Sequence, residues 1–316
     1  MSKRCRYIMV GGFLGAGKTT AIQSLAQHLT DTGQRVGLIC NDQSTGLVDT
    51  ALLRSKGFSV EEITGGCFCC RFDSLLEAAQ NLTSDSAPDL FLAEPVGSCT
   101  DLVATVSYPL RRIYGDRFSV APLSVVVDPG RAARIFGLTQ GGHFSEKVTY
   151  VYRKQLEEAD LIVINKCDAS PPEILDRVVL AINEAFPHAK TFVCSAKYGT
   201  NLEPWFKSLL SEEIPVSRPL EINYDTYAEG EALLGWLNCT VRLKTDQPLT
   251  AIAHSWPWLM TSVIVWSTKV DVLHISRQRS IPTTVVVHFQ SLVSLKTMTN
   301  LTYVSLCSIT LTADRW

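Results

Sequence analysis

Short apolar runs alternate with helical stretches over residues 6–200 of the chain. The apolar runs are rich in β-branched residues and end in polar residues, which is the pattern of a parallel sheet buried between helices. Ligands bind beyond the carboxyl ends of such strands, so the polar residues after each run are candidates for a site. We expect strands within residues 6–15, 36–42, 89–95, 123–129, 159–168 and 190–196, and helices within 19–33 and 73–84.

The pattern changes beyond residue 210. Residues 213–230 are predicted to form a linker, which leads into a C-terminal region over residues 231–316. No glutamate occurs after Glu231, and residues 251–316 are dense in Ser, Thr and Val with little helical periodicity. We expect this region to be a smaller, poorly defined α+β or β-rich unit, divergent or incomplete as a second domain, and we place no function there.

The composition narrows the class of protein. Apolar residues make up 46% of the 316 residues, enough for a sizeable core, and the formal net charge of −2 does not indicate general nucleic-acid binding. The N-terminus lacks the features of a signal peptide, and no run of about 18 apolar residues predicts a membrane span. We therefore expect a cytoplasmic protein, in which clustered cysteines indicate metal or redox chemistry more often than disulfides.

A glycine-rich segment, GFLGAGKT over residues 12–19, fits the phosphate-loop pattern G-x-x-x-x-G-K-[ST], with a strand before it and a helix after it. Glycines let backbone N–H groups turn onto phosphates, and the helix N-terminus adds its positive end. Lys18 is expected to reach the β- and γ-phosphates and Thr19 to ligate Mg²⁺. A ligand-free glycine turn is the alternative, which the complete motif disfavours. The expected phosphate-binding residues are Gly12, Gly15, Ala16, Gly17, Lys18, Thr19 and Thr20.

These patterns together predict an α/β fold. We expect a P-loop NTPase domain over residues 1–212, with a mostly parallel sheet flanked by helices.

A second motif, Asn165-Lys166-Cys167-Asp168, follows the apolar run LIVI and is typical of loops that recognise guanine in GTPases. A carboxylate such as Asp168 accepts hydrogen bonds from the guanine N1–H and exocyclic amine together, whereas adenine would leave it unpaired. Asn165 is expected to brace the loop, and the stem of Lys166 to lie against the base.

A third segment, Ser195-Ala196-Lys197, follows the next apolar run and matches the second guanine-contacting loop, where a backbone amide meets the base carbonyl. The four-residue NKCD match is weak by itself. With the phosphate loop before it and this segment after it, the sequence favours GTP over ATP.

Acidic residues stand at three predicted strand ends. A carboxylate at the position of Glu94 commonly holds Mg²⁺ or positions the attacking water, although it could be only a solvated strand end. Gly97 is expected to give its N–H to the γ-phosphate. Asp42 is a second candidate for Mg²⁺ or for a transported metal. Asp128 has a similar placement, and the alternative is that it only starts a turn with Pro129.

Three cysteines, Cys67, Cys69 and Cys70, lie between a Gly-Gly turn and a predicted helix. A tight loop can point these thiols at one centre, and three thiolates suit Zn²⁺ above all, with Co²⁺ as a further candidate. Three ligands in one loop leave a position for exchange, which suits a carrier. A redox thiol cluster and buried small hydrophobes are the alternatives. The candidates for a fourth ligand are Glu62, Asp42 and Cys99.

The ordered motifs GGFLGAGKTT, GGCFCC, AEPVG and NKCD resemble the CobW family of P-loop GTPases, which is related to the GTPases that mature nickel enzymes. The resemblance covers residues 6–231 and implies a GTP-hydrolysing metallochaperone for zinc or cobalt. It implies that Gly12 to Thr20 bind phosphate and Mg²⁺, that the three cysteines hold the metal, and that Asn165, Lys166 and Asp168 recognise guanine. The chain departs from the family in its EPVG and Asn-Asp segments and lacks a His-rich tract.

The leading hypothesis is a GTP-driven carrier that hands a metal to a client protein, with no nucleic-acid or membrane partner; a homo-oligomer stays open. The first alternative is a GTPase with a fixed structural or sensory metal or a redox thiol switch. A P-loop small-molecule kinase is a further alternative, which NKCD and SAK disfavour.

Overall fold

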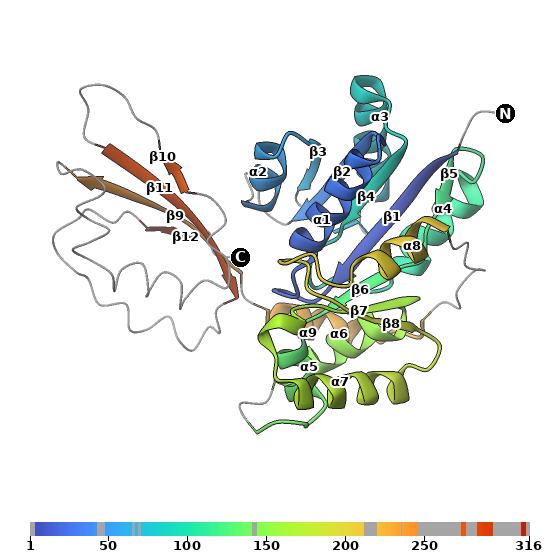
Figure 1. Cartoon of the computed structure of the whole chain (residues 1–316), viewed down its shortest axis with the longest axis vertical. Helices are drawn as coiled ribbons and strands as arrows, with labels where there is room; N and C mark the ends of the chain where they lie inside the picture. The colour runs from blue at the N-terminus through green and yellow to red at the C-terminus, as the bar shows by residue number, and fades with distance from the viewer. Residues whose placement is uncertain are drawn as a thin grey trace. The chain divides into compact units, whose positions relative to one another are not determined.

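A computed structural model describes residues 4–42, 48–64, 67–68, 71–140, 144–211, 220–234, 236–245, 273–275, 283–292 and 311–313. The chain divides into two compact units, Met1–Leu233 and Leu234–Trp316 (Figure 1). Each unit is described by itself.

The first unit is built on one parallel sheet, as the sequence predicts. Its strands run in the order β3-β2-β4-β1-β6-β7-β8, and β5 also pairs with β1. The carboxyl ends of the central strands therefore meet at one edge of the sheet, where the motifs lie. The strands are β1 (Cys5–Gly12), β2 (Val36–Asp42), β3 (Ser59–Thr64), β4 (Leu90–Glu94), β5 (Phe118–Val120), β6 (Ser124–Val127), β7 (Leu161–Ile164) and β8 (Lys190–Val193).

Helices connect the strands and cover the sheet. They are α1 (Lys18–Asp31), α2 (Val48–Ser55), α3 (Phe72–Ser86), α4 (Tyr108–Ile113), α5 (Pro129–Ile135), α6 (Glu146–Glu157), α7 (Pro172–Ala185), α8 (Glu203–Ser211) and α9 (Tyr224–Ala232), with a π-helical turn at Val103–Ser107 and a 3₁₀ turn at Cys167–Ala169.

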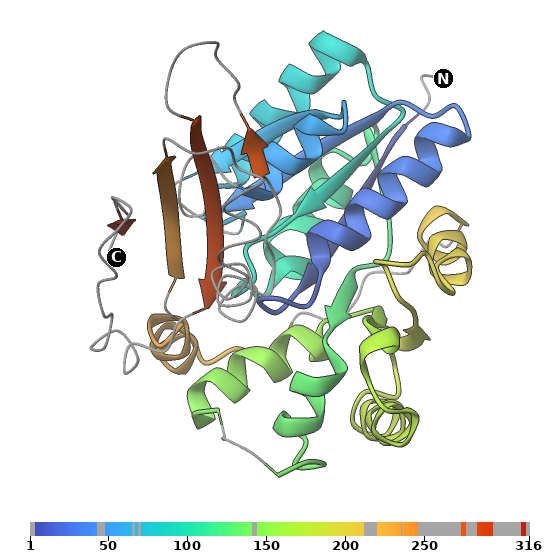
Figure 2. The same ribbon diagram turned by 60° about the vertical axis from the view of Figure 1, so that its left-hand side comes forward.

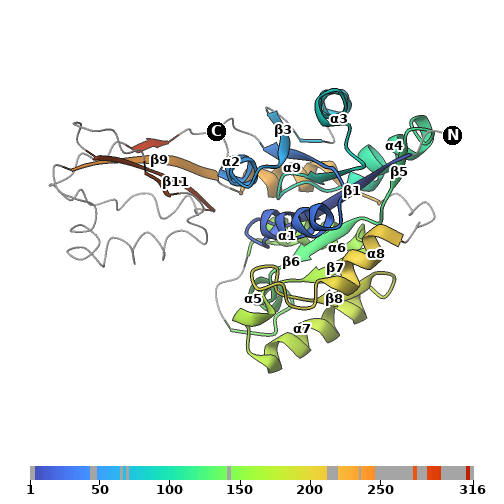
Figure 3. The same cartoon turned by 45° about the horizontal axis from the view of Figure 1, so that its top comes forward.

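Helix α1, blue in Figure 2, runs lengthwise along the sheet, and it shares one buried cluster with α8 and the strands beneath. Helices α3 and α4 lie on the opposite face (Figure 3). Trp205 of α8 donates from its indole nitrogen to the Ser124 hydroxyl at 2.9 Å, which fastens α8 to the start of β6. Both faces of the sheet are thus covered, as an all-parallel sheet requires.

The edge strand β3 is absent from the expected strands. Its sequence, SVEEIT, carries two adjacent glutamates, and only Val60 and Ile63 of its six residues are buried. Because an edge strand is less fully covered by helices and neighbouring strands than a central strand, it can keep polar residues. It therefore lacks the continuous apolar run by which the central strands are recognised in the sequence.

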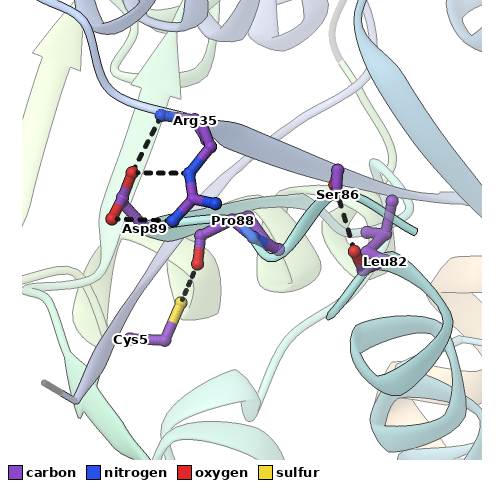
Figure 4. Close-up of polar contacts among 6 residues, drawn as sticks. All are labelled: Cys5, Arg35, Leu82, Ser86, Pro88 and Asp89. Carbon is purple, nitrogen blue, oxygen red and sulfur yellow. Dashed lines mark hydrogen bonds and ion pairs between the residues drawn. The ribbon is translucent and has the colours of Figure 1, made fainter. Parts of the chain in front are cut away.

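The amino ends of β2 and β4 are tied together on the side away from the motifs (Figure 4). Arg35 donates from its backbone N and its Nε to Asp89 Oδ2 at 3.1 and 3.2 Å. The Cys5 thiol donates to the Pro88 carbonyl at 3.5 Å. These contacts hold three neighbouring strands in register before they reach the site.

The second unit contains an antiparallel sheet in the order β10-β11-β9-β12, which agrees with the β-rich expectation for this part of the chain. Its strands are β9 (Trp236–Thr245), β10 (Leu273–Ile275), β11 (Thr283–Leu292) and β12 (Leu311–Ala313).

Part of the stretch expected as a linker, residues 213–230, belongs to α9, which packs against α6. Residues 213–219 of that stretch lie outside the described residues, so the expected domain limits stay a prediction. None of the described helices has the length and apolarity needed to cross a membrane.

Candidate functional site

The phosphate loop leaves β1 at Gly12 and enters α1 at Lys18. Gly17, just before the helix, has φ +96°, a left-handed conformation that favours glycine. A Cβ at this position would lie 2.5 Å from the Asn165 Nδ2 atom, so a larger residue would also collide with the guanine loop. The loop is therefore shaped both by its own glycines and by a residue far away in the sequence.

Three polar side chains are buried together at the start of α1. The Thr19 hydroxyl donates to Glu94 Oε1 at 2.9 Å, and Lys18 Nζ lies 4.0 Å from the same oxygen. Lys18, Thr19 and Glu94 are all less than one-tenth exposed. The structure thus brings the predicted phosphate lysine, the predicted Mg²⁺ threonine and the acidic strand end into contact.

Gly97 approaches the phosphate loop closely. A Cβ on Gly97 would lie 2.6 Å from Leu14 Cδ2 and 3.1 Å from the Leu14 backbone nitrogen, so only glycine fits. The Val96 carbonyl accepts a hydrogen bond from the Cys99 N–H at 3.0 Å. Among the described residues, the Gly97 N–H has no hydrogen-bond partner.

Asn165 links the guanine loop to the phosphate loop. Its Nδ2 donates to the Ala16 carbonyl at 3.0 Å, and its Oδ1 accepts from the Ala196 N–H at 2.9 Å. The side chain is buried and uses both ends of its amide, as the bracing role requires.

Lys166, in the left-handed conformation with φ +58°, reaches across the same loop. Its Nζ donates to the Gly15 carbonyl at 2.6 Å and to Asp128 Oδ2 at 2.8 Å. Burial opposes ionisation of Asp128, but the bond and charge of Lys166 and the Arg131 N–H outweigh it and lower the pKa of this carboxyl. Asp128 also caps α5, so it both starts the turn at Pro129 and anchors the guanine loop.

The remaining guanine candidates lie beside this loop. Asp168 is exposed, whereas Ser195 is fully buried. The Ala196 N–H already donates to Asn165, so it is not available to a base. The Lys197 N–H has no partner within the described part of the chain, which makes it the candidate donor to a base carbonyl. The Lys197 ammonium lies 4.8 Å from the centre of the Tyr198 ring.

Asn41, at the end of β2, holds the start of the cysteine loop. Its Nδ2 donates to the Ile63 carbonyl at 3.0 Å, and its Oδ1 accepts from the Phe68 N–H at 2.9 Å. Phe68 is fully buried, and the Arg71 guanidinium donates to the Thr64 carbonyl at 2.8 Å. Sequence reasoning did not single out Asn41 for this role.

The cysteines themselves are only partly described. Cys67 is half-buried and takes part in a disulfide, and Cys69 and Cys70 lie outside the described residues. The disulfide departs from the expectation of reduced thiols. No cluster of three metal-ligating side chains occurs among the residues that the structure describes.

Two of the three fourth-ligand candidates lie near this loop by strand register. Glu62 belongs to β3 and Asp42 pairs with Thr64 at its end. One oxygen of Glu62, Oε1, is buried without a hydrogen-bond partner in the described part of the chain. Cys99 lies elsewhere, in the loop after β4, where burial and the negative charge of Glu231 raise the pKa of its thiol well above the usual range.

Arg131 is a further residue that sequence reasoning missed. Its guanidinium lies 5.3 Å from the centre of the Phe13 ring, and its Nη2 would be 3.5 Å from a Cβ on Gly15. Its Nε and Nη1 are buried and have no hydrogen-bond partner within the described ranges. Burial lowers the pKa of Arg131 from its usual value, yet a guanidinium stays charged at neutral pH. It adds a cation beside the phosphate loop.

Comparison with known proteins gives a family match over residues 6–193, to the model described as the CobW/HypB/UreG nucleotide-binding domain. The zinc chaperone YeiR of Escherichia coli (strain K12) is 31% identical over 168 residues, which cover 52% of this chain and 47% of that protein. The zinc chaperone CobW of Sinorhizobium sp is 30% identical over 179 residues, which cover 51% and 50% respectively.

Among solved structures, HypB from Helicobacter pylori in complex with nickel aligns with a TM-score of 0.49 and 19% identity, covering 67% of this chain and 88% of that one. The chain spans about half the length of the curated relatives it matches.

Proposed function

Because the chain belongs to the CobW/HypB/UreG family, we propose that it binds and hydrolyses GTP and uses that cycle to carry a transition metal, zinc first, to a client protein. One observation carries the proposal. Asn41, on the strand next to that of Glu94, holds Phe68 in the middle of the C-F-C-C segment. A single hydrogen bond from the end of β2 thus connects the proposed nucleotide side of the sheet to the cysteine loop.

Binding of GTP is supported by the arrangement of the phosphate and guanine loops. Lys18 would reach the β- and γ-phosphates, and Asn165 and Lys166 tie the guanine loop to Ala16 and Gly15. Asp168 is exposed beside them, where its carboxylate is open to a base. A ligand-free glycine turn would not need hydrogen bonds to the guanine loop, so these bonds disfavour that alternative. The Asp168 carboxylate would be unpaired against adenine, which disfavours an ATP-dependent kinase.

The buried pair of Thr19 and Glu94 fits Mg²⁺. Both offer oxygen atoms, 2.9 Å apart at the start of α1, and hard cations of this kind prefer oxygen ligands. When bound, Mg²⁺ would neutralise charge on the β- and γ-phosphate oxygens. Glu94 would hold the ion directly or position the attacking water, and Lys18 would balance the charge of the transferred group.

We assign the carried metal to Cys67, Cys69 and Cys70, because three thiolates suit zinc and because two curated relatives are named zinc chaperones. Glu62 and Asp42 are the preferred sources of a fourth ligand, since Asp42 ends β2 and Glu62 lies two residues before the end of the neighbouring β3, which leads into the loop. We discount Cys99, because burial and Glu231 oppose formation of its thiolate.

The cycle would work through loop order. GTP would order the loops after β2 and β4, and Asn41 would pass that order to the cysteine loop, which assembles the zinc site. Hydrolysis would loosen the same loops and release the metal. The coupling must be reciprocal, so zinc must tighten GTP binding by the factor by which GTP tightens zinc binding.

The disulfide of Cys67 favours a second candidate function, a thiol switch. An oxidised Cys67 has no thiolate to offer a metal, so the same loop would bind zinc only when reduced. This redox role is compatible with GTP hydrolysis and replaces the carrier role only if zinc binds equally to both nucleotide states.

The decisive experiment measures zinc affinity in reducing buffer with GDP and with a non-hydrolysable GTP analogue. We expect tighter binding with the analogue, and loss of binding in a Cys67→Ser, Cys69→Ser, Cys70→Ser triple variant. Equal zinc affinity in both nucleotide states would refute the carrier, and wild-type affinity in the triple variant would refute the site.

A further inference from the structure

We propose that Gln155 is a positioning residue for GTP hydrolysis, which holds the loop after β4 so that the Gly97 N–H faces the γ-phosphate; this rests on the proposed GTPase function. Gln155 lies on α6, 58 residues from Gly97 in the sequence. Its Nε2 donates to the Gly97 carbonyl at 3.0 Å and to the Cys99 carbonyl at 2.9 Å.

Both protons of one amide nitrogen are used on this loop. A side-chain NH₂ group has two donors, so each carbonyl receives one of them. The side chain is only 2% exposed, so water cannot replace it. Without Gln155, both loop carbonyls would be left buried, at a cost of about 1–3 kcal/mol each for an unsatisfied buried group.

The bond pattern fixes the direction of the Gly97 N–H. The Val96 carbonyl is turned inward onto the Cys99 N–H. Because the peptide between Val96 and Gly97 is planar and trans, the Gly97 N–H points the opposite way. A Cβ on Gly97 would lie 3.1 Å from the Leu14 backbone nitrogen, so Gly97 itself lies beside the phosphate loop.

Three contacts with α9 also hold this loop, and in one of them the Tyr227 hydroxyl donates to the Ser98 carbonyl at 3.4 Å. The Ser98 hydroxyl donates to Glu231 Oε1 of α9 at 2.7 Å, and Tyr224 of α9 donates to Asp101 Oδ2 at 2.6 Å. These bonds fix the far half of the loop. Only Gln155 contacts the carbonyl of Gly97 among the described residues.

The consequence is selective for the triphosphate. GDP has no γ-phosphate, so a residue that aims the Gly97 N–H contributes nothing to GDP binding. Loss of one aimed hydrogen bond should weaken binding of a GTP analogue by about 5- to 20-fold and lower kcat by at least about 10-fold.

The test compares Gln155→Met, which keeps the side-chain volume, with wild type and with the matched control Gln27→Met. Gln27 is exposed on α1, where its amide donates to Asp31 and to no other residue in the described ranges. Affinities for GDP and for a non-hydrolysable GTP analogue are measured by titration, and GTP turnover by phosphate release. We expect Gln155→Met to keep GDP affinity within about 2-fold and to lose analogue affinity and kcat as stated.

Equal losses for GDP and the analogue would show a merely structural role and overturn the proposal, as would wild-type values for both. Where Gln155→Met does not fold, Gln155→Glu answers the same question, because it keeps the shape but removes the paired donors. Absence of GTP turnover in the wild-type chain would refute the proposed GTPase instead, and the inference with it. Equal GTP turnover in wild type and in Gln155→Met would refute the role of Gln155 and leave the proposed GTPase function intact.

Discussion

Replacing Asn41 with alanine tests the link between the nucleotide side and the cysteine loop. The change removes the donor to the Ile63 carbonyl and the acceptor for the Phe68 N–H, and it replaces none of the predicted ligands. Asn41 is 5% exposed, so water does not readily replace either bond.

The magnitude follows from these two bonds. A buried backbone group left without a partner costs about 1–3 kcal/mol, so the two together should destabilise the first unit by about 2–6 kcal/mol. The Phe68 bond alone belongs to the metal loop. If the loss of this bond makes the free energy of zinc binding less favourable by about 1–2 kcal/mol, because zinc must then order the loop without it, zinc affinity falls by about 5- to 30-fold.

Asn41→Asp separates the two bonds. The carboxylate keeps an acceptor for the Phe68 N–H but faces the Ile63 carbonyl with no donor. We expect this variant to retain more zinc affinity than Asn41→Ala, while its stability falls at least as far. Asn183→Ala serves as the control, since Asn183 is exposed and its side chain accepts a bond only from Thr191 among the residues that the structure describes.

The assay is competition of the protein with a chelator for zinc, in reducing buffer with GDP and with a GTP analogue, alongside chemical unfolding. Zinc affinity of Asn41→Ala within about 2-fold of wild type, in a preparation where the triple serine variant binds no zinc, would refute the reasoning. The cysteine site would then stand without its link to β2.

Three further predictions follow from buried polar groups and from the guanine loop. Asn165→Ala should lower affinity for GDP and GTP alike and reduce stability by about 2–4 kcal/mol, because two buried bonds between the loops are lost; nucleotide titration and chemical unfolding check this, and unchanged values would count against the bracing role. Burial raises the pKa of Glu158 to about 8 from 4.5, so ionisation opposes folding, and wild-type stability should fall as pH rises from about 4.5 to about 8 and then level off. Glu158→Gln, which keeps an acceptor for the Val103 N–H, should remove that fall; an identical pH profile in urea unfolding would contradict the assignment. Asp168→Ala should reduce the preference for GTP over ATP by at least about 10-fold, because the paired acceptor for guanine is lost; competition between the two nucleotides measures it, and an unchanged preference would move base recognition elsewhere.

The local motifs could be found in the sequence because their chemistry is contiguous. Eight successive residues make the phosphate loop, and four make the guanine loop, so their spacing alone carries the information. The buried strands could also be found, since a parallel sheet covered on both faces leaves continuous apolar runs. Edge strand β3 could not, because the adjacent and only partly buried Glu61 and Glu62 interrupt its apolar run.

The supporting residues escaped sequence reasoning for a different reason. On α6, Val148, Val151, Tyr152 and Gln155 are buried on one face. A glutamine on an apolar stripe was the available signal, because a buried amide needs partners. The spacing of apolar residues on this helix predicts that Gln155 is buried, but it does not predict which carbonyls accept its hydrogen bonds.

The sequence by itself determined the kind of chemistry: a phosphate loop, a carboxylate for guanine and clustered thiols are each written in one short segment. The tertiary structure decided what holds these segments in relation to one another. Asn41 meets Phe68, Asn165 meets Ala16 and Gln155 meets Gly97 across 27, 149 and 58 positions of chain. Hydrogen bonds between such distant residues depend on how the strands are ordered in the sheet, and no local pattern records that order.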